Sequence, residues 1–195
     1  APYFLSLGLF VGALICTLVI PMRESEVIGA SRFNRFISRT LTFSAMSLLQ
    51  SLLAAIVLLL GLGLKVQNVP LFLAFTFITS LSFMWVIQAI VTWLDQPGRF
   101  VVIVVLIFQL TTSAGTFPLE LIPNWMKFFN PLLPMTYSVK GFKAVISTGD
   151  YSAMWGDAGK LAFYGIAFLA LTFTYFMTRN AENEAVMKSE QVLTV

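Results

Sequence analysis

Side chains that could do chemistry are few and scattered in this chain of 195 residues. There is no histidine and only one cysteine, Cys16, so the chain cannot build a zinc cluster, an internal disulfide, or a Ser-His-Asp or Cys-His pair. The carboxylates of Glu120, Asp150 and Asp157 are expected to lie isolated from one another in one loop. The sequence contains no G-x-x-x-x-G-K-S/T phosphate-binding loop. We therefore predict that the chain is not an enzyme, holds no metal or cofactor, and does not hydrolyse ATP by that route.

Three glutamines, Gln50, Gln88 and Gln109, are the other polar groups that stand out, because each lies within a long apolar run. An uncharged amide can hydrogen-bond across a helix interface for roughly 1 kcal/mol, and helix association is the favoured interpretation. The alternative is an intramembrane polar pathway, to which Thr111 and Thr112 beside Gln109 would contribute. We expect no ionisable side chain buried within a span. Its absence counts against ion-coupled transport but leaves open a transporter driven by a separate ATPase.

The amino-acid composition is that of a membrane protein. The chain is 58% hydrophobic and 11% charged, with a mean hydropathy of +0.86, whereas soluble domains are roughly 45–50% apolar and about 25% charged. Uncharged apolar runs of about 18 or more residues are long enough to cross a hydrocarbon layer of about 30 Å as helices. We predict an all-α integral membrane protein with five transmembrane helices, at about 3–22, 41–64, 70–94, 100–117 and 158–178.

The net charge of +3 follows the expected topology and does not indicate nucleic-acid binding. The first loop holds Arg23, Arg32, Arg35 and Arg39, while the next loop holds only Lys65. Basic residues collect on the cytoplasmic side of membrane proteins. We therefore predict a multi-pass membrane protein, with residue 1 outside and the C-terminal tail in the cytoplasm.

The cytoplasmic loop at 23–39 has the pattern of an amphipathic surface helix. On a helical wheel Arg32, Arg35 and Arg39 share one narrow stripe, and an apolar face adjoins it. The apolar residues are Phe33, Phe36 and Ile37. One interpretation is a simple anchor on anionic lipids. The other is a docking element for a cytoplasmic partner.

The segment 118–150 cannot be one continuous helix. Pro118, Pro123, Pro131 and Pro134 fall within 17 residues, and each removes a backbone donor and disfavours helix in the residue before it. Apolar residues recur at helical spacing on both sides of the last proline: Trp125, Phe128, Phe129 and Leu132, then Met135, Val139, Phe142 and Ile146. We predict two short amphipathic helices that enter the outer leaflet and return, a geometry that membranes tolerate where protein or a wet cavity shields the backbone.

Two segments carry a resemblance to a known family. They are Gln-Leu-Thr-Thr-Ser-Ala-Gly-Thr-Phe-Pro at 109–118 and Asn-Pro-Leu-Leu-Pro-Met-Thr-Tyr-Ser-Val at 130–139. Both resemble the C-terminal membrane domain of the bacterial phage infection protein (Pip-type) family, within the ABC type-2 exporter permease superfamily. The resemblance covers essentially the whole chain.

The resemblance implies a place in a larger protein and two sets of site residues. Members carry five C-terminal spans after a long extracellular segment, so we expect this chain to be the C-terminal part of a longer protein. The first loop would contact an ATPase, and the broken segment would form the outer gate. The implied contact residues are Arg32, Phe33, Arg35, Phe36 and Arg39, and the implied gate residues are Phe117, Pro118, Pro123, Pro131, Pro134 and Tyr137.

Two functions remain open on this basis. The first is a permease-like membrane domain of an export or secretion assembly, with any ATPase in a separate chain. The alternative is a non-transporting membrane anchor for a large extracellular domain used in phage adsorption or cell-surface recognition. Small residues at Gly8, Gly12, Ser47 and Ser51 allow close helix approach, so a homodimer is expected among the partners. Membrane lipids, an ATPase or secretion-system subunit, and a phage or surface ligand complete the expected partners.

Overall fold

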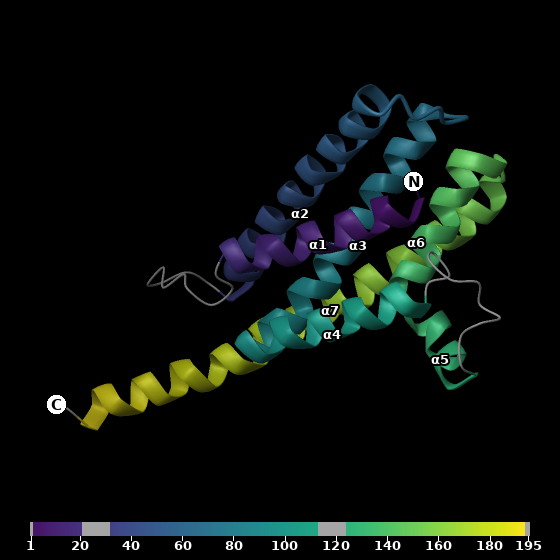
Figure 1. Cartoon of the computed structure of the whole chain (residues 1–195). Helices are drawn as coiled ribbons and strands as arrows, with labels where there is room; N and C mark the ends of the chain where they lie inside the picture. The colour runs from purple at the N-terminus through teal and green to yellow at the C-terminus, as the bar shows by residue number, and fades with distance from the viewer. Residues whose placement is uncertain (1, 21–31, 113–123, 194–195) are drawn as a thin grey trace.

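The computed structural model describes residues 2–20, 32–112 and 124–193, and every regular element in these ranges is helical (Figure 1). The α-helices are α1 Pro2–Val19, α2 Arg32–Ile56, α3 Val69–Leu94, α4 Gln96–Thr112, α5 Asn124–Phe129, α6 Pro134–Lys143 and α7 Tyr151–Leu193. Three short elements join them: the π-helices η1 Val57–Gly61 and η4 Ala144–Thr148, and the 3-10 helix η3 Asn130–Leu132.

Four described helical segments are long and apolar enough to cross a membrane. They are Pro2–Val19, Phe33–Gly61, Val69–Leu94 and Tyr151–Thr178. The remaining predicted span, 100–117, corresponds to α4, which begins earlier at Gln96 and has 17 residues up to Thr112. Residues 113–117 lie outside the described part. The prediction of an all-helical, multi-pass membrane protein is confirmed, and the count of five spans stays a prediction.

Helix α3 is the centre of the bundle, with α1, α2, α4, α6 and α7 packed around it. It begins where the Asn68 side chain accepts a hydrogen bond from the backbone N–H of Leu71, which caps the first turn. Large side chains on several of its faces are almost fully buried: Phe72, Phe75, Phe83, Met84 and Ile87. A helix that is buried over most of its circumference needs no single apolar stripe, and this explains why periodicity alone does not reveal its central position.

Close packing between α3 and α6 depends on one glycine. A Cβ atom on Gly141 would lie 2.1 Å from Cζ of Phe75, far inside van der Waals contact. The Phe75 ring meets the Phe142 ring edge-to-face, with 4.8 Å between ring centres. Glycine at position 141 therefore lets the proline-broken segment lie directly against the central helix.

The loop predicted at 23–39 differs from the structure in its second half. Helix α2 runs from Arg32 to Ile56, so residues 32–39 are the first turns of the membrane helix, not a separate surface helix. The sequence 32–56 has no proline or glycine to end a helix. In addition, Phe36 packs edge-to-face on Phe173 of α7, with 5.2 Å between ring centres. Residues 23–31 lie outside the described part.

The last helix also begins earlier than predicted. Helix α7 starts at Tyr151, where the Asp150 carboxylate accepts a hydrogen bond from the N–H of Ala153 at 3.0 Å and caps the helix. The helix therefore includes Asp157, which the sequence had placed in the preceding loop. The side chain of Asp157 is buried, so the expectation of no buried ionisable group within a span is wrong.

The predicted segment 118–150 is described from Asn124 onward as two short helical pieces, α5 with η3 and α6 with η4. Leu133 separates them in extended conformation (φ −100°, ψ 123°), as expected for a residue that precedes proline. Entry of these pieces into the outer leaflet stays a prediction. Phe117, Pro118 and Pro123 lie outside the described residues.

Candidate functional site

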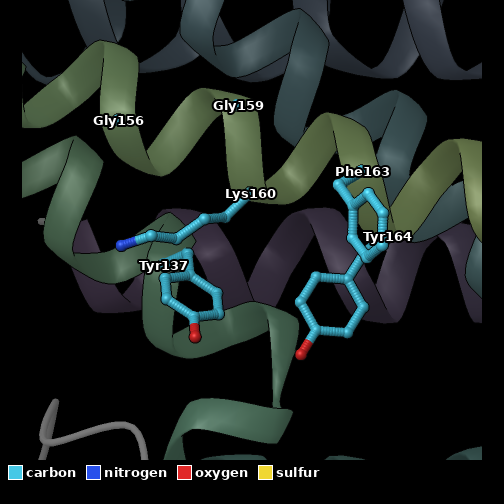
Figure 2. A pocket seen from close by; sticks show the side chains of 6 residues that line it. All are labelled: Tyr137, Gly156, Gly159, Lys160, Phe163 and Tyr164. Atoms are coloured by element: carbon cyan, nitrogen blue, oxygen red, sulfur yellow. The ribbon is translucent and has the colours of Figure 1, made fainter.

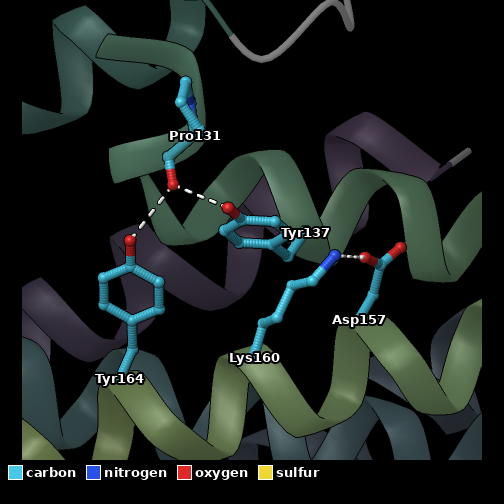
Figure 3. Close-up of polar contacts among 5 residues, drawn as sticks. All are labelled: Pro131, Tyr137, Asp157, Lys160 and Tyr164. Atoms are coloured by element: carbon cyan, nitrogen blue, oxygen red, sulfur yellow. Dashed lines mark hydrogen bonds and ion pairs between the residues drawn. The ribbon is translucent and has the colours of Figure 1, made fainter.

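Pro131 carries a backbone carbonyl that two helices share. The Tyr137 hydroxyl of α6 donates to this oxygen at 2.7 Å, and the Tyr164 hydroxyl of α7 donates to it at 3.1 Å (Figure 3). The two tyrosine rings lie 6.1 Å apart between centres. A single acceptor in η3 therefore holds α6 and α7 at a fixed separation.

Asn130, the preceding residue, extends these links to a third helix. Its backbone carbonyl accepts a hydrogen bond from the Thr136 hydroxyl at 2.7 Å. Its side-chain amide donates to the backbone carbonyl of Thr112, at the end of α4, where helical carbonyls lack intrahelical partners. We call Asn130 and Pro131, with the side chains bonded to them, the Asn130–Pro131 junction. It connects α4, α6 and α7.

The residues that follow the junction explain why this stretch of sequence is distinctive. Pro134 occupies the first turn of α6. Backbone N–H groups in the first turn of a helix have no intrahelical acceptor, so proline, which lacks an N–H, loses no hydrogen bond there. Met135 and Thr136 are almost fully buried, and the Ser138 hydroxyl bonds to the Ser6 hydroxyl of α1 at 2.9 Å. The segment 130–138 thus joins four helices through side chains that are mostly small and polar.

A groove of about 490 Å³ opens beside the junction (Figure 2). Its lining residues are Tyr137, Gly156, Gly159, Lys160, Phe163 and Tyr164. The Lys160 ammonium lies 4.9 Å from the centre of the Tyr137 ring, a cation–π contact. Lys160 Nζ is also 3.4 Å from Asp157 Oδ1.

The Asp157–Lys160 pair is asymmetric. The Asp157 side chain is only 11% exposed, whereas the Lys160 side chain is 56% exposed. A half-exposed pair contributes little to stability, and a buried carboxylate without a partner would be costly. The pairing therefore accounts for how Asp157 can be buried in α7 while Lys160 reaches the groove.

Sequence reasoning did not single out Lys160 and Tyr164 as site residues, and it placed Asp157 alone in a loop. A signal was present in their spacing, because residues 157, 160 and 164 recur at three and four positions and share one face of a helix. That signal becomes visible only when the last helix is known to start at Tyr151.

The three glutamines have different environments on three helices. Gln50 of α2 donates from Nε2 to the Leu9 carbonyl of α1 at 2.7 Å, as helix association predicts. A Cβ on Gly12 would lie 2.9 Å from Cδ of Gln50, so that glycine makes room for the amide. Gln88 of α3 and Gln109 of α4 are 1% and 0% exposed, and neither amide oxygen nor nitrogen has a partner among the described residues.

The predicted docking residues divide between two faces of α2. Phe33 is 52% exposed and points away from the bundle, and Ile37 is exposed with it. Arg35 and Arg39 are half-buried, on the same side as Phe36, which contacts α7. The side chain of Arg32 lies outside the described part. Arg35 and Arg39 are therefore partly covered, and of the apolar residues only Phe33 and Ile37 are exposed.

A bundle of apolar, membrane-length helices is consistent with an ABC-2 transporter permease. The chain belongs to this family: residues 1–174 match the family described as ABC-2 family transporter protein. Proteins of the family are membrane transport components. The chain is also similar to the uncharacterized protein YhgE of Bacillus subtilis (strain 168), with 44% identity over 183 residues.

That alignment covers 94% of this chain and 24% of YhgE, so the chain spans about a quarter of the length of this relative. No solved structure matches the chain at a significant level. The comparisons support the permease superfamily that the sequence predicted. The narrower Pip-type assignment stays a prediction.

Proposed function

We propose that this chain is the permease-like membrane domain of an export or secretion assembly in the bacterial cell membrane, driven by an ATPase in a separate chain. Membership of the ABC-2 transporter family supports the proposal. The structural observation that carries it is the path of α7. This single helix contacts the first turns of α2 through Phe173 and reaches the Asn130–Pro131 junction through Tyr164.

Helix α7 therefore links the first turns of α2 mechanically to the Asn130–Pro131 junction. Phe173 and Tyr164 are about 14 Å apart along the axis of α7, at about 1.5 Å per residue. A partner that displaces the start of α2 would press through Phe36 on α7 and shift Tyr164 relative to Pro131. The hydrogen bonds at the shared carbonyl contribute only about 1 kcal/mol each. A small movement of α7 is therefore enough to release η3 from the helices around it.

We place the ATPase contact on the outward face of the first turns of α2. Phe33 and Ile37 are exposed there, while the half-buried Arg35 and Arg39 lie on another face of the helix. Aromatic side chains, phenylalanine among them, are enriched in the buried centre of protein interfaces. Among the predicted docking residues we therefore propose Phe33 as the main contact, because Phe36 already packs on Phe173 of α7.

The test is copurification of ATP hydrolysis with the full chain from its native membranes. Wild-type protein is expected to carry vanadate-sensitive hydrolysis, and Phe33→Ser is expected to lose most of it. The matched control is Phe100→Ser, because Phe100 is 68% exposed near the start of α4 and no contact with the partner is expected there. Hydrolysis that is absent from wild type, or that survives Phe33→Ser unchanged, would contradict the proposal.

The second candidate is a membrane anchor for an extracellular domain that recognises phage or cell surfaces, in the manner of the Pip-type family. The observation that favours it is that most of the length of YhgE lies outside the aligned segment. Under this hypothesis an unrelated anchor in place of the bundle would preserve phage adsorption and every later step. Retained adsorption with loss of DNA entry would instead favour a permease. A homodimer and a secretion-system subunit are further proposed partners under the first hypothesis.

A further inference from the structure

We propose that the groove beside the Asn130–Pro131 junction binds the phosphate headgroup of an anionic membrane lipid, with Lys160 as the residue that contacts the phosphate. The groove holds about 490 Å³ and is lined by three aromatic rings, two glycines and this lysine. Figure 2 shows the Lys160 side chain extending along the groove beside Tyr137. This inference does not depend on the transport proposal, since an anchor could bind the same lipid.

The position of Lys160 along α7 matches the depth of lipid phosphates. Trp155, five positions earlier, is 53% exposed, and exposed tryptophans collect at the membrane–water interface. Phe163 and Ile166, in the next turns, are 71% and 61% exposed and suit contact with hydrocarbon. Lys160 therefore lies between an interfacial residue and a lipid-facing apolar surface, where a lysine extends its ammonium toward the headgroups.

Space for a headgroup exists next to the ammonium. A Cβ on Gly156 or on Gly159 would meet no atom within 4 Å, so the helix surface in the turn before Lys160 is open. The hydroxyls of Tyr137 and Tyr164 already donate to the Pro131 carbonyl. These rings therefore form the walls of the groove. The Lys160 ammonium is the group that would donate a hydrogen bond to a phosphate oxygen.

The ammonium has donor capacity left for this contact. A lysine ammonium has three N–H donors, and Asp157 Oδ1 accepts one of them at 3.4 Å. The Tyr137 ring stabilises the positive charge without using an acceptor. Asp157 holds the ammonium at the groove, but its negative charge opposes an incoming anion. Lys160 and Asp157 should therefore affect lipid binding in opposite directions.

A lipid fits these features better than a soluble phosphate or a second copy of the chain. One lysine that is partly neutralised by a carboxylate has little attraction for a hydrated phosphate ion. A lipid brings acyl chains that contact the exposed Phe163 and Ile166 while its phosphate reaches Lys160. A second copy would have to place a carboxylate or another acceptor at this depth.

The experiment measures lipid retention by native mass spectrometry on the full chain purified in detergent. The probes are phosphatidylglycerol, zwitterionic phosphatidylcholine, and inorganic phosphate. We expect wild type to prefer phosphatidylglycerol. We expect Lys160→Gln to weaken that binding about fivefold, the usual effect of one lysine near an anionic lipid surface. Asp157→Asn should strengthen it, and Lys160→Arg should retain it.

The matched control is Lys140→Gln, which removes the same charge from an exposed position on α6. Thermal midpoints without lipid show whether each variant folds, and Lys160→Arg keeps the comparison informative if Lys160→Gln does not. Equal retention by Lys160→Gln and Lys140→Gln would overturn the proposal. It would also fail if Asp157→Asn weakened binding, if inorganic phosphate bound as tightly as the lipid, or if Lys160→Gln changed the dimer fraction instead of lipid retention.

Discussion

The Tyr164 hydroxyl of α7 donates a hydrogen bond to the Pro131 carbonyl at 3.1 Å, across 33 positions of the sequence. Tyr137 donates to the same oxygen at 2.7 Å, so the two tyrosines share one acceptor. A carbonyl oxygen has two lone pairs and satisfies both donors. Either tyrosine alone therefore keeps the Pro131 carbonyl hydrogen-bonded.

Tyr137→Phe and Tyr164→Phe should each destabilise the protein by only about 0.5 kcal/mol, because one donor still reaches the Pro131 carbonyl. The double variant should lose about 1.5–2 kcal/mol, more than the sum, because the carbonyl then has no donor. Equilibrium unfolding in mixed detergent micelles, arranged as a double-mutant cycle, measures the coupling. Tyr151→Phe makes the same chemical change elsewhere on α7 and serves as the control. Strict additivity would mean that the two hydroxyls do not share an acceptor.

Gly141→Ala should destabilise the bundle by about 1–3 kcal/mol, because its Cβ would meet Cζ of Phe75 at 2.1 Å. Reducing the opposing side chain with Phe75→Leu should recover part of that loss in the double variant. The control is Gly8→Ala, where a Cβ would have no neighbour within 4 Å and where alanine favours the helix. Unfolding midpoints compare the four variants. An unchanged midpoint for Gly141→Ala would show that α6 does not lie against α3 this closely.

Replacing each glutamine with the similarly shaped methionine should distinguish the half-buried amide of Gln50 from the buried amides of Gln88 and Gln109. Gln50→Met loses the bond to the Leu9 carbonyl and should cost about 0.5–1.5 kcal/mol. Gln88→Met and Gln109→Met remove amides that have no partner among the described residues, so stability should stay equal or rise.

An export assay on the same three variants tests the polar-pathway interpretation. If Gln88 and Gln109 serve a polar pathway, their methionine variants should lose activity while they keep their stability. Stability losses equal to that of Gln50→Met would instead show that Gln88 and Gln109 make interhelical bonds.

Topology can be checked by labelling single cysteines with a membrane-impermeant maleimide, after Cys16→Ser. Gln67→Cys and Ser152→Cys should label from the same side, because Gln67 lies against Gly149, just before α7. Pro97→Cys should label from the opposite side, where Arg99 donates to the Thr17 carbonyl at the end of α1. The positive-inside rule makes the side of Gln67 and Ser152 external, so Ala30→Cys should resist label added from outside. Labelling of position 30 from outside would reverse the orientation.

The outline of the fold was predictable because its cause is local. Uncharged runs of sufficient length must be helical in lipid, where every backbone group needs an internal partner. The run at 70–94 therefore agrees with the helical segment Val69–Leu94 within one residue at its start, whereas the run at 41–64 falls in the segment Phe33–Gly61, which begins eight residues earlier. The break before Pro134 was also predictable, because proline restricts the residue before it.

Helix boundaries near charged residues were less predictable. The charges of Arg35, Arg39 and Asp157 suggested loops, yet each residue lies on a helix that continues through it. Charge marks where a helix can meet water but does not end it, because a lysine or arginine extends along the surface and a carboxylate can pair. Capping residues such as Asp150 set the boundaries instead.

By itself the sequence determined that the chain is a multi-pass helical membrane protein without histidine or disulfide chemistry, and that 118–150 is broken. These properties depend on composition and on neighbours in the chain. Only the tertiary structure decided that Pro131 is shared by Tyr137 and Tyr164, and that Lys160 borders a groove with a buried carboxylate behind it. The physical reason is that hydrogen bonds and ion pairs act over a few ångströms in space. Packing around α3 determines which helices, distant in the sequence, bring these hydrogen-bonding and charged groups together.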